Sequence, residues 1–427
     1  MLLHAAAVVV ATVRLPGKTH PLFHFWLPFG FLGLISWSVW LFRRTLSGLY
    51  RPTKNEHWQD ASIVAPAFRE DPQVLEAAVR SWLAAGAAEI LIVIPTDEPE
   101  NAIHAKTTFA AEPRVRVLSN DDPDKRRMLA VGIRATRNDI VVLSDSDTVW
   151  ERDLLENILM PFADARVGGV GTRQRVVDMT SSVWRRAAEW MLDAKYLAYL
   201  PAMSLQGGVS CLSGRTVAYR RDALVPVLDD LVDERFLGRR CVSGDDGRLT
   251  WLVLNQGYKT VYQKNAVAWT MMPDGFRGFI NQRIRWSRNS WRCYLRAILK
   301  GWLFKQPITT RLSVLQMLFA PVSLTVGFTF VGFAAARHDY TAVAFWFVWI
   351  NCGRGIRAFD HLLENPRNIL LLPLITVLVL FVLTAVKYFA FFTMNKQAWI
   401  TRREDRDVAQ GQAFETLDEP AELGAVA

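Results

Sequence analysis

The chain has 427 residues, of which 51% are hydrophobic and 21% charged, and its formal net charge at pH 7 is +9. It is too apolar to be disordered and long enough for more than one domain. The four cysteines, Cys211, Cys241, Cys293 and Cys352, show no C-x-x-C spacing, which excludes a disulfide scaffold and a zinc site of common spacing. The excess of positive charge favours an anionic partner: nucleic acid, lipid or an anionic substrate.

The N-terminal region predicts a membrane span. Residues 21–42 contain one histidine and no formally charged residue, and about 20 apolar residues are enough to cross a bilayer. Arg43 and Arg44 follow at once, so the positive-inside rule places the next part of the chain in the cytoplasm. Residues 1–13 are also apolar and predict a short or truncated first span.

Residues 50–300 alternate between strand and helix patterns. Short apolar runs predict strands at 61–66, 89–94, 115–118 and 139–143, and helical spacing predicts helices at 73–85 and 125–136. This alternation is typical of a doubly wound α/β sheet. Such sheets bind ligands at the carboxyl ends of their strands. We therefore expect the functional residues to follow these strands.

Acidic residues stand at two such positions. Asp145 and Asp147 follow the strand 139–143 directly, and oxygen ligands at this spacing suit Mg²⁺ or Mn²⁺ held together with substrate phosphates. Asp97 ends the strand 89–94 and is a candidate for contact with a nucleotide base or ribose. The alternative for these acids is an ordinary turn, helix cap or solvated loop.

Basic and acidic residues at two predicted helix starts complete the candidate site. Lys125 and Arg126 open a helix, where cations oppose the helix dipole, so a bound phosphate would explain them better than stability does. The alternative is a solvated basic patch. Asp245 and Asp246 follow Gly244 before a helix-like stretch, and one of them is a candidate general base.

The segment Gln282-Arg-Ile-Arg-Trp286 combines two guanidinium groups with a large ring. Arg283 and Arg285 suit a diphosphate, and Trp286 suits the flat face of a sugar. Residues 275–280 before it predict an amphipathic approach to the bilayer surface. Taken alone, this segment could also be an interfacial basic helix with no ligand.

Apolar segments return after residue 310. Residues 312–335 predict a span, 340–352 are apolar over a shorter run, and 368–394 are apolar apart from Pro373 and Lys387. A buried core helix would explain any one of these runs. Because they lie at both ends of the chain and are flanked by arginine, membrane spans explain them better. Their number, and so the side of the C-terminus, stays open.

These motifs, in this order and between predicted spans, resemble the processive family 2 glycosyltransferases, which include cellulose, chitin and hyaluronan synthases. The resemblance covers roughly residues 61–403. It includes the opening loop 65–70, the helix start at 124–129, the segment 211–220 with Ser213 and Gly214 near the acceptor, and Trp399-Ile-Thr-Arg402, which is similar to a terminal W-G-T-R. The stretch 285–292 is most similar to hyaluronan synthases. Two departures are Gly247, which moves the next arginine to Arg248, and Ile400 in place of glycine.

The resemblance implies a GT-A fold in a multi-pass protein of the plasma membrane, with the catalytic domain in the cytoplasm. It divides the chain into five parts: an N-terminal transmembrane region 1–45, a glycosyltransferase domain 50–270, interfacial helices 271–310, a C-terminal transmembrane region 311–395, and an interfacial segment with an acidic tail 396–427. The implied partners are UDP-sugar donors, a growing polysaccharide acceptor and the lipid bilayer. Nucleic acid is not expected, because the basic residues gather at 283–296 and beside the spans.

The resemblance also implies residue roles in inverting transfer. Asp97 would contact uridine, Lys125 and Arg126 the donor, and Asp145 and Asp147 the metal. Asp246, with Asp245 as its competitor, would be the base. The diphosphate would be held by Gln282, Arg283 and Arg285, and Trp286 would stack under the terminal acceptor sugar. Similarity to hyaluronan synthases implies UDP-GlcNAc and UDP-GlcA as the donor pair.

Three alternatives accompany this interpretation. A nonprocessive family 2 transferase would act on a lipid or short glycan, and a glucan- or chitin-type synthase would polymerise another sugar. A membrane receptor or scaffold with a nucleotide-binding module is the third, and three catalytic motifs in family order argue against it.

Overall fold

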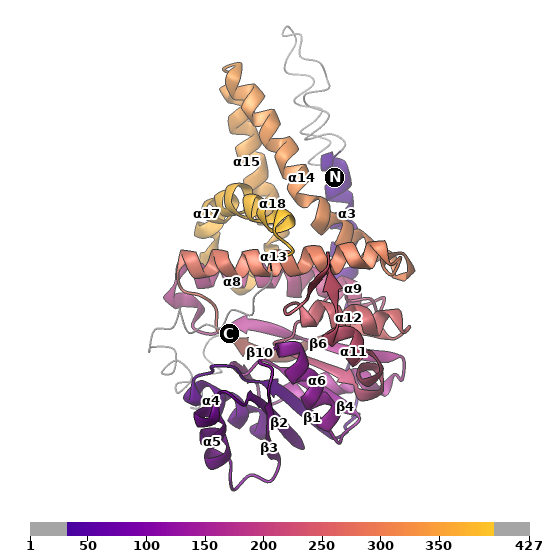
Figure 1. Cartoon of the computed structure of the whole chain (residues 1–427). Helices are drawn as coiled ribbons and strands as arrows, with labels where there is room; N and C mark the ends of the chain where they lie inside the picture. Colours follow the sequence, from indigo (N-terminus) through magenta and orange to yellow (C-terminus); the bar gives the residue numbers. More distant parts are fainter. Residues whose placement is uncertain (1–31, 397–427) are drawn as a thin grey trace.

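The structure is a computed structural model and describes residues 32–396 of the chain (Figure 1). The predictions for residues 1–13, for the first part of 21–42, for Trp399–Arg402 and for the acidic tail lie outside the described residues. The described chain begins with helix α3 (Leu32–Leu49), which includes Arg43 and Arg44. Two bodies follow: a sheet covered by helices, and a group of apolar helices on one side of it.

An eight-stranded sheet with the order β3-β2-β1-β4-β7-β6-β10-β5 forms the centre of the molecule. The first four strands in this order pair in parallel and confirm the four predicted strands: β1 (Ala61–Pro66), β2 (Glu89–Pro95), β3 (Val115–Asn120) and β4 (Ile140–Ser144). The helices between them are α4 (Pro72–Ala84), α5 (Pro99–Thr108) and α6 (Lys125–Ala135). Figure 1 shows these strands together with α4, α5 and α6.

The other half of the sheet is mixed, so the prediction of a doubly wound sheet holds only for the first half. Strand β7 (Thr216–Arg220) pairs antiparallel with β4 and with β6 (Val167–Val176). Strand β10 (Lys259–Thr270) pairs in parallel with β6 and antiparallel with β5 (Thr148–Trp150). After β4 the chain forms β5 and β6, and β7 then pairs antiparallel with the edge of β4 that β1 does not occupy. The strand direction therefore changes between β4 and β7.

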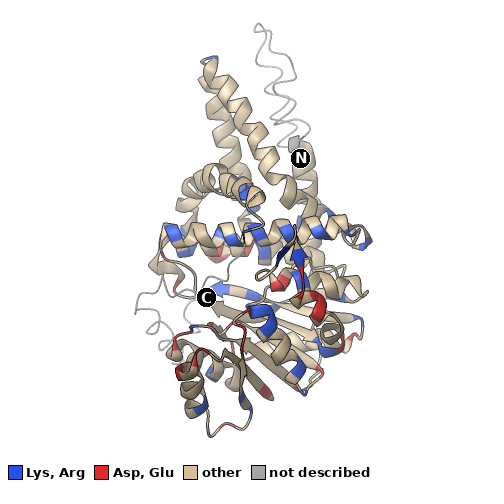
Figure 2. Ribbon diagram, in the orientation of Figure 1, with Lys and Arg blue, Asp and Glu red and all other residues tan. Residues whose placement is uncertain are grey.

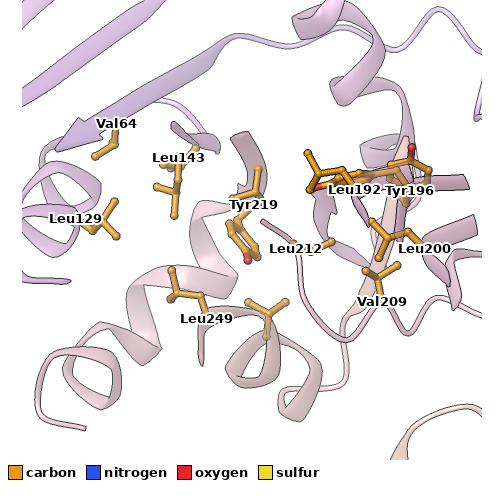
Figure 3. Packing of buried hydrophobic residues seen from close by; sticks show 14 of the residues in the cluster. Val64, Leu129, Leu143, Leu192, Tyr196, Leu200, Val209, Leu212, Tyr219 and Leu249 are labelled. Carbon is orange, nitrogen blue, oxygen red and sulfur yellow. The ribbon is translucent and has the colours of Figure 1, made fainter. Parts of the chain in front are cut away.

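Apolar side chains bury both faces of the sheet. One cluster includes Val64, Leu143 and Tyr219, and α6 and α12 (Asp245–Asn255) cover it with Leu129 and Leu249 (Figure 3). A second cluster, which includes Ile63, Ile92 and Val142, lies under α4 and α7 (Leu154–Leu159). Strands buried on both faces read as continuous apolar runs, which is why β1, β2 and β4 were readable from the sequence.

Helices between the sheet and the apolar helices form a platform. They are α8 (Val183–Asp193), a π-helical turn (Ala194–Tyr199), α9 (Leu200–Ser204), α12 (Asp245–Asn255) and α13 (Phe276–Leu299). Smaller pieces, α10 (Arg221–Leu224), α11 (Leu228–Val232), β8 (Arg235–Phe236) and β9 (Arg239–Arg240), lie at the side. Helix α13 crosses the molecule between the sheet and the apolar helices in Figure 1, and it includes the whole 282–286 motif.

Two helical segments among residues 32–396 are long and apolar enough to cross a membrane: Ile308–Ala336, with a mean hydropathy of 1.8, and Pro366–Phe392, with 3.0. The first is helix α14, which forms a hairpin with α15 (Tyr340–Arg357). The second combines a 3-10 helix (Pro366–Leu371), α17 (Leu372–Val377), a π-helical turn (Leu378–Leu383) and α18 (Thr384–Phe392). Figure 2 draws α14 and α15 almost entirely without charged residues.

Helix α16 (Phe359–Glu364) contacts α3 and the sheet domain through acid–base pairs. Asp360 pairs with Arg44 of α3 at 2.8 Å, and Glu364 pairs with Arg173 of β6. His361 Nδ1 lies 2.8 Å from Asp193 Oδ2 of α8, and both side chains are buried, whereas the other two pairs are partly exposed.

Candidate active site

The loop after β4 is held from three sides. The Asp145 N–H donates to the Arg215 carbonyl at 3.0 Å, and the Thr148 N–H donates back to the Asp145 carbonyl at 3.2 Å. The Ser146 hydroxyl donates to Glu70 Oε2 at 2.7 Å. These bonds turn the chain at the carboxyl end of β4, so the carboxylates of Asp145 and Asp147 lie at the edge where α/β sheets bind ligands.

Lys125 joins this loop to the second acidic motif. Its Nζ lies 2.7 Å from Asp145 Oδ1 and 3.4 Å from Asp245 Oδ2. Burial alone lowers the pKa of Lys125, but the carboxylates of Asp145 and Asp245 outweigh that effect and raise the pKa above its ordinary value. Lys125 is therefore a fixed ammonium group between two acidic motifs that lie about one hundred residues apart in sequence.

Asp245 and Asp246 occupy the first turn of α12. The turn begins at Gly244, whose φ of 79° lies in the left-handed region that glycine adopts without strain. Asp246 Oδ1 accepts from the Gly247 N–H at 2.7 Å, which leaves Oδ2 facing the Cys211 sulfur at 3.9 Å. Burial, followed by the adjacent charge of Asp245, raises the pKa of Asp246. A base with a raised pKa binds a proton more readily, as general base catalysis requires.

Gly214 packs directly against these groups. A Cβ atom at this position would lie 3.3 Å from Asp246 Cβ, 3.4 Å from Asp245 Oδ2 and 3.9 Å from Lys125 Nζ. The structure thus brings together five residues that the sequence predicted separately, from the end of β4, from α6, from α12 and from the loop before β7. They are Lys125, Asp145, Gly214, Asp245 and Asp246.

The motif on α13 approaches the same site from the side of the apolar helices. The Ser243 hydroxyl donates to Asn289 Oδ1 at 3.0 Å, which ties α13 to the turn before α12. Gln282 is buried, and its Oε1 has no hydrogen-bond partner in the described part of the chain. The guanidinium carbons of Arg283 and Arg215 lie 4.6 Å and 4.8 Å from the ring centre of Trp286. Cations therefore cover part of the ring that was predicted to stack on a sugar.

Arg126 is placed away from this cluster, which does not support the predicted donor contact. Its side chain is 1% exposed, and Nη1 lies 2.6 Å from Glu234 Oε2. Glu234 also pairs with Arg248 at 3.3 Å and with Arg296 at 3.0 Å. Arg126 is thus part of a buried ionic cluster that joins α6, α12 and α13. Lys125, the preceding residue, points to the opposite side and reaches the acids.

Asp97 and Ser213 are two further predicted positions. Asp97 is exposed just beyond the end of β2, and no hydrogen bond joins it to another described residue. The Ser213 hydroxyl donates to Gln174 Oε1 at 3.2 Å. These placements leave the predicted contacts of Asp97 with uridine and of Ser213 with the acceptor as predictions.

Two polar residues beside the site were missed by sequence reasoning. Arg215 Nη1 donates to Gln174 Oε1 at 2.9 Å, and both side chains are buried. Arg215 directly follows Ser213 and Gly214 in the segment 211–220, which resembles the acceptor region of the family. This position could have identified Arg215 as a site residue from the sequence. Gln174 is a polar residue inside a buried strand, flanked by Arg173 and Arg175, and such a residue calls for a polar partner.

The donor set at the β4 loop fits a divalent cation bound together with a substrate. No cluster of three or more His, Cys, Asp or Glu side chains that could hold a metal occurs in residues 32–396. Asp145 and Asp147 supply carboxylates from one short loop, and Mg²⁺ is commonly held by one or two carboxylates plus substrate phosphates. Lys125 beside Asp145 adds a positive group for the same phosphates.

The sheet, with its parallel and mixed halves and acids at its carboxyl edge, defines a GT-A glycosyltransferase. Residues 59–289 match the family model described as "Glycosyltransferase like family 2", and the chain belongs to this family.

Relatives of known name cover most of the chain. A hyaluronan synthase from Streptococcus pyogenes serotype M3 is 26% identical over 393 residues, which cover 88% of this chain and 91% of the relative. An N-acetylglucosaminyltransferase from Mesorhizobium japonicum is 26% identical over 376 residues, with 84% and 85% covered. A type 2 glycosyltransferase from Gibberella zeae is 27% identical over 382 residues, with 85% and 72% covered.

A solved structure shares the fold. The mannosyltransferase of Pyrobaculum calidifontis, solved in complex with GDP-Man and Mn²⁺, has a TM-score of 0.59 and covers 91% of this chain and 98% of its own. Its sequence is 18% identical, so the likeness shows the GT-A fold alone. Together with the family match, it confirms the prediction of a family 2 glycosyltransferase with a GT-A fold.

Proposed function

We propose that this glycosyltransferase polymerises a polysaccharide from UDP-sugars by inverting transfer and extrudes it through its own membrane region. The observation that supports this most is the convergence of Lys125, Asp145, Asp245 and Asp246 beside Gly214, at the face of the sheet domain that α13 covers. One cluster thus contains groups suited to a diphosphate and a group suited to an acceptor hydroxyl.

The proposed reaction assigns a role to each of these residues and keeps the roles that the family resemblance implies for Asp97, Gln282 and Arg285. Asp246 takes the proton of the acceptor hydroxyl as that oxygen bonds to the anomeric carbon, and the bond from this carbon to the diphosphate breaks, so that UDP leaves with the electron pair. Asp245, salt-bridged to Lys125, helps position Lys125. Lys125, Gln282 and Arg285 hold the diphosphate, and Asp97 contacts uridine. A Mg²⁺ or Mn²⁺ ion bound by Asp145 and Asp147 would neutralise charge on the leaving diphosphate.

The membrane assignment rests on the apolar helices. The hairpin of α14 and α15 crosses the bilayer and returns. Segment Pro366–Phe392 lies in the bilayer with its two ends next to α16 and α13, on the cytoplasmic side. Helix α13 lies at the cytoplasmic surface, and the sheet domain is cytoplasmic. We keep the division into a transmembrane region 1–45, a catalytic domain 50–270, interfacial helices 271–310, a second transmembrane region 311–395 and the tail 396–427. The plasma membrane is the proposed location.

The product is proposed to be a hyaluronan-like polymer of GlcNAc and GlcA. Support comes from the likeness to a hyaluronan synthase along 88% of the chain. A nonprocessive transferase that acts on a lipid or short glycan is the second candidate, because a protein named N-acetylglucosaminyltransferase covers the chain almost as well.

The test is an assay of the purified full chain with a panel of radiolabelled UDP-sugars, singly and in pairs, followed by product sizing. The proposal predicts a high-molecular-mass product only when UDP-GlcNAc and UDP-GlcA are both present. A long product from UDP-glucose alone would assign a glucan synthase. Transfer of a single sugar to a lipid or short glycan would assign the nonprocessive enzyme. An Asp246→Asn variant, assayed in parallel, shows whether the product depends on the site described above.

A further inference from the structure

Arg283 stands out among the buried arginines on α13 because it lacks an anionic partner among the described residues and two of its guanidinium nitrogens lack a hydrogen bond. Its side chain is 9% exposed, and Nε and Nη2 form no hydrogen bond within residues 32–396. Burial, followed by the neighbouring positive charge of Arg215, lowers the pKa of Arg283 to about 9. Its neighbours are the rings of Phe279 and Trp286, each 4.6 Å from the guanidinium carbon.

A second cation, Lys387, lies on α18, the apolar helix that packs along α13. It forms no ion pair with any residue the structure describes. The Trp291 ring N–H donates to the Lys387 carbonyl at 3.0 Å, which holds α18 against α13 at this point. Ionisable residues inside apolar membrane helices are costly and commonly mark a ligand pathway.

This arrangement is unfavourable unless an anion completes it. A buried charge without a partner is costly, and Arg215, which contacts the same Trp286 ring, adds a like charge. Cation–π contact with Trp286 compensates for only part of this cost. The donor site differs, because its cation Lys125 already has two carboxylate partners.

We propose that Arg283 and Lys387 form a subsite beside Trp286 that binds the carboxylate of an acidic sugar in the acceptor chain. This inference rests on the proposed polymerising function and specifies its substrate: the acceptor contains hexuronate. It replaces the diphosphate contact that the sequence predicted for Arg283. The diphosphate is assigned to Lys125 and to the metal ion that Asp145 and Asp147 would hold, whereas Arg283 packs on Phe279 and Trp286.

The choice of a sugar carboxylate follows from the position of the cations. The Arg283 guanidinium touches the ring of Trp286, so an acceptor sugar at the edge of this ring brings its own substituents next to the cation. Lys387 continues the positive charge toward the apolar helices, the direction in which the proposed product leaves. An acidic chain would meet both cations in turn, whereas a neutral glucan would leave both unpaired.

Binding of defined oligosaccharides to the full-length protein in detergent tests the subsite. Titration calorimetry with saturating UDP compares hyaluronan oligosaccharides with chitin oligosaccharides of equal length. Arg283→Gln should weaken binding of the acidic oligosaccharide about 10- to 100-fold, as expected for loss of a charged hydrogen bond, and leave the neutral one unchanged. Lys387→Gln should act in the same direction, and Arg283→Lys should retain the preference. UDP affinity should stay at the wild-type value in all three variants.

Arg288→Gln is the matched control, because Arg288 lies on the same helix and its Nε donates to Thr393 Oγ1 at 3.0 Å, away from Trp286. Equal loss of acidic and neutral oligosaccharides in Arg283→Gln, with a lowered unfolding temperature, would make Arg283 structural and overturn the proposal. Loss of UDP affinity would return Arg283 to the diphosphate. Displacement of the acidic oligosaccharide by a polyprenyl phosphate, dependent on Arg283, would assign the cations to a lipid phosphate instead.

These outcomes are separate from those of the polymerase assay. Selective binding of the acidic oligosaccharide through Arg283 supports the subsite even if no polymer forms. A long polymer made from UDP-GlcNAc alone, with wild-type affinity equal for both oligosaccharides, overturns the subsite and leaves the polymerising function standing.

Discussion

The acidic cluster at the sheet edge and the cations on α13 and α18 differ in how their charges are balanced. At the edge of the sheet, Lys125 is shared between Asp145 and Asp245, so positive and negative groups already balance one another. On α13 and α18, Arg283 and Lys387 have no acidic partner among the described residues. Figure 2 shows the same contrast on a larger scale, with Lys and Arg placed along α13 beneath nearly uncharged helices.

The contrast indicates different binding events. At the sheet edge, the ion pairs of Lys125 must be replaced by contacts with the donor and its metal when the donor binds. The affinity there depends on the donor and the metal together. A site with excess positive charge gains directly from any anion that enters. Substitutions at the two sites should show whether donor binding and acceptor binding depend on different residues.

Asp246→Asn should have the largest effect on the reaction. The amide keeps the size of the side chain but cannot accept the proton of the acceptor hydroxyl, and general base catalysis contributes about 10²- to 10⁴-fold. We expect turnover, measured as UDP release with acceptor present, to fall by that factor while UDP affinity is unchanged.

The exposed Asp229, which pairs with Arg134 at the surface, provides the control for this change. Asp229→Asn should keep full turnover. If Asp246→Asn turns over near the wild-type rate and Asp245→Asn is inactive, the base is Asp245. If both variants stay active, the assignment of the base to this motif is wrong.

Removal of divalent metal should also stop the reaction. Two carboxylates on the β4 loop can hold Mg²⁺ or Mn²⁺ on the donor diphosphate, and metal stabilisation of a leaving group is worth several kcal/mol. We expect EDTA to abolish UDP release and added Mn²⁺ or Mg²⁺ to restore it. Full activity in the chelator, with the metal content verified by mass spectrometry, would contradict the metal assignment.

Arg126 and Lys125 are adjacent in sequence, and their substitution should separate stability from activity. Arg126→Gln removes one of three arginines that pair with Glu234, so it should cost less than the about 3–5 kcal/mol expected when a buried charge loses its last partner. We expect a lower thermal midpoint for Arg126→Gln. Lys125→Gln should unfold near the wild-type temperature and lose donor affinity. Equal destabilisation by the two changes would show that the sheet edge is a structural cluster.

The pH profile should show the smallest effect, a shift of one limb. Burial and the charge of Asp245 raise the pKa of Asp246 above its ordinary value of 3.8, and the base acts only when ionised. Activity, as kcat/KM, should therefore fall as the pH drops through this raised pKa. Asp245→Asn removes the adjacent charge and should move the acidic limb to lower pH. A limb that stays in place or moves upward would contradict the coupling of the two acids.

The sequence predicted the parallel half of the sheet and most of the catalytic cluster for a physical reason. Strands β1, β2 and β4 are buried on both faces and read as unbroken apolar runs, and the acids follow them directly. Strand β6 was not recognised because Gly168, Gly169 and Gly171 interrupt its apolar pattern. At Gly168 a Cβ atom would lie 2.5 Å from Tyr258 Cβ, so close packing explains the glycine.

Long-range partners account for the remaining differences. Arg126 and Glu234 lie 108 positions apart, and no local pattern shows which of two adjacent cations turns inward. The cover of Trp286 by Arg215 and Arg283 likewise depends on two segments meeting in space. Local sequence reports the type of each residue, whereas the packing of α13 on the sheet decides what each side chain can reach.

Titration of UDP and a divalent metal into two variants tests most directly whether donor binding and acceptor binding use separate residues. Asp147→Asn changes the donor side, and Trp286→Ala removes the aromatic surface on the acceptor side. We expect Asp147→Asn to lose most of the metal-dependent affinity for UDP. Trp286→Ala should bind UDP as the wild type does, yet transfer sugar poorly and make shorter products. Equal loss of UDP affinity in both variants would contradict the separation of donor and acceptor sites.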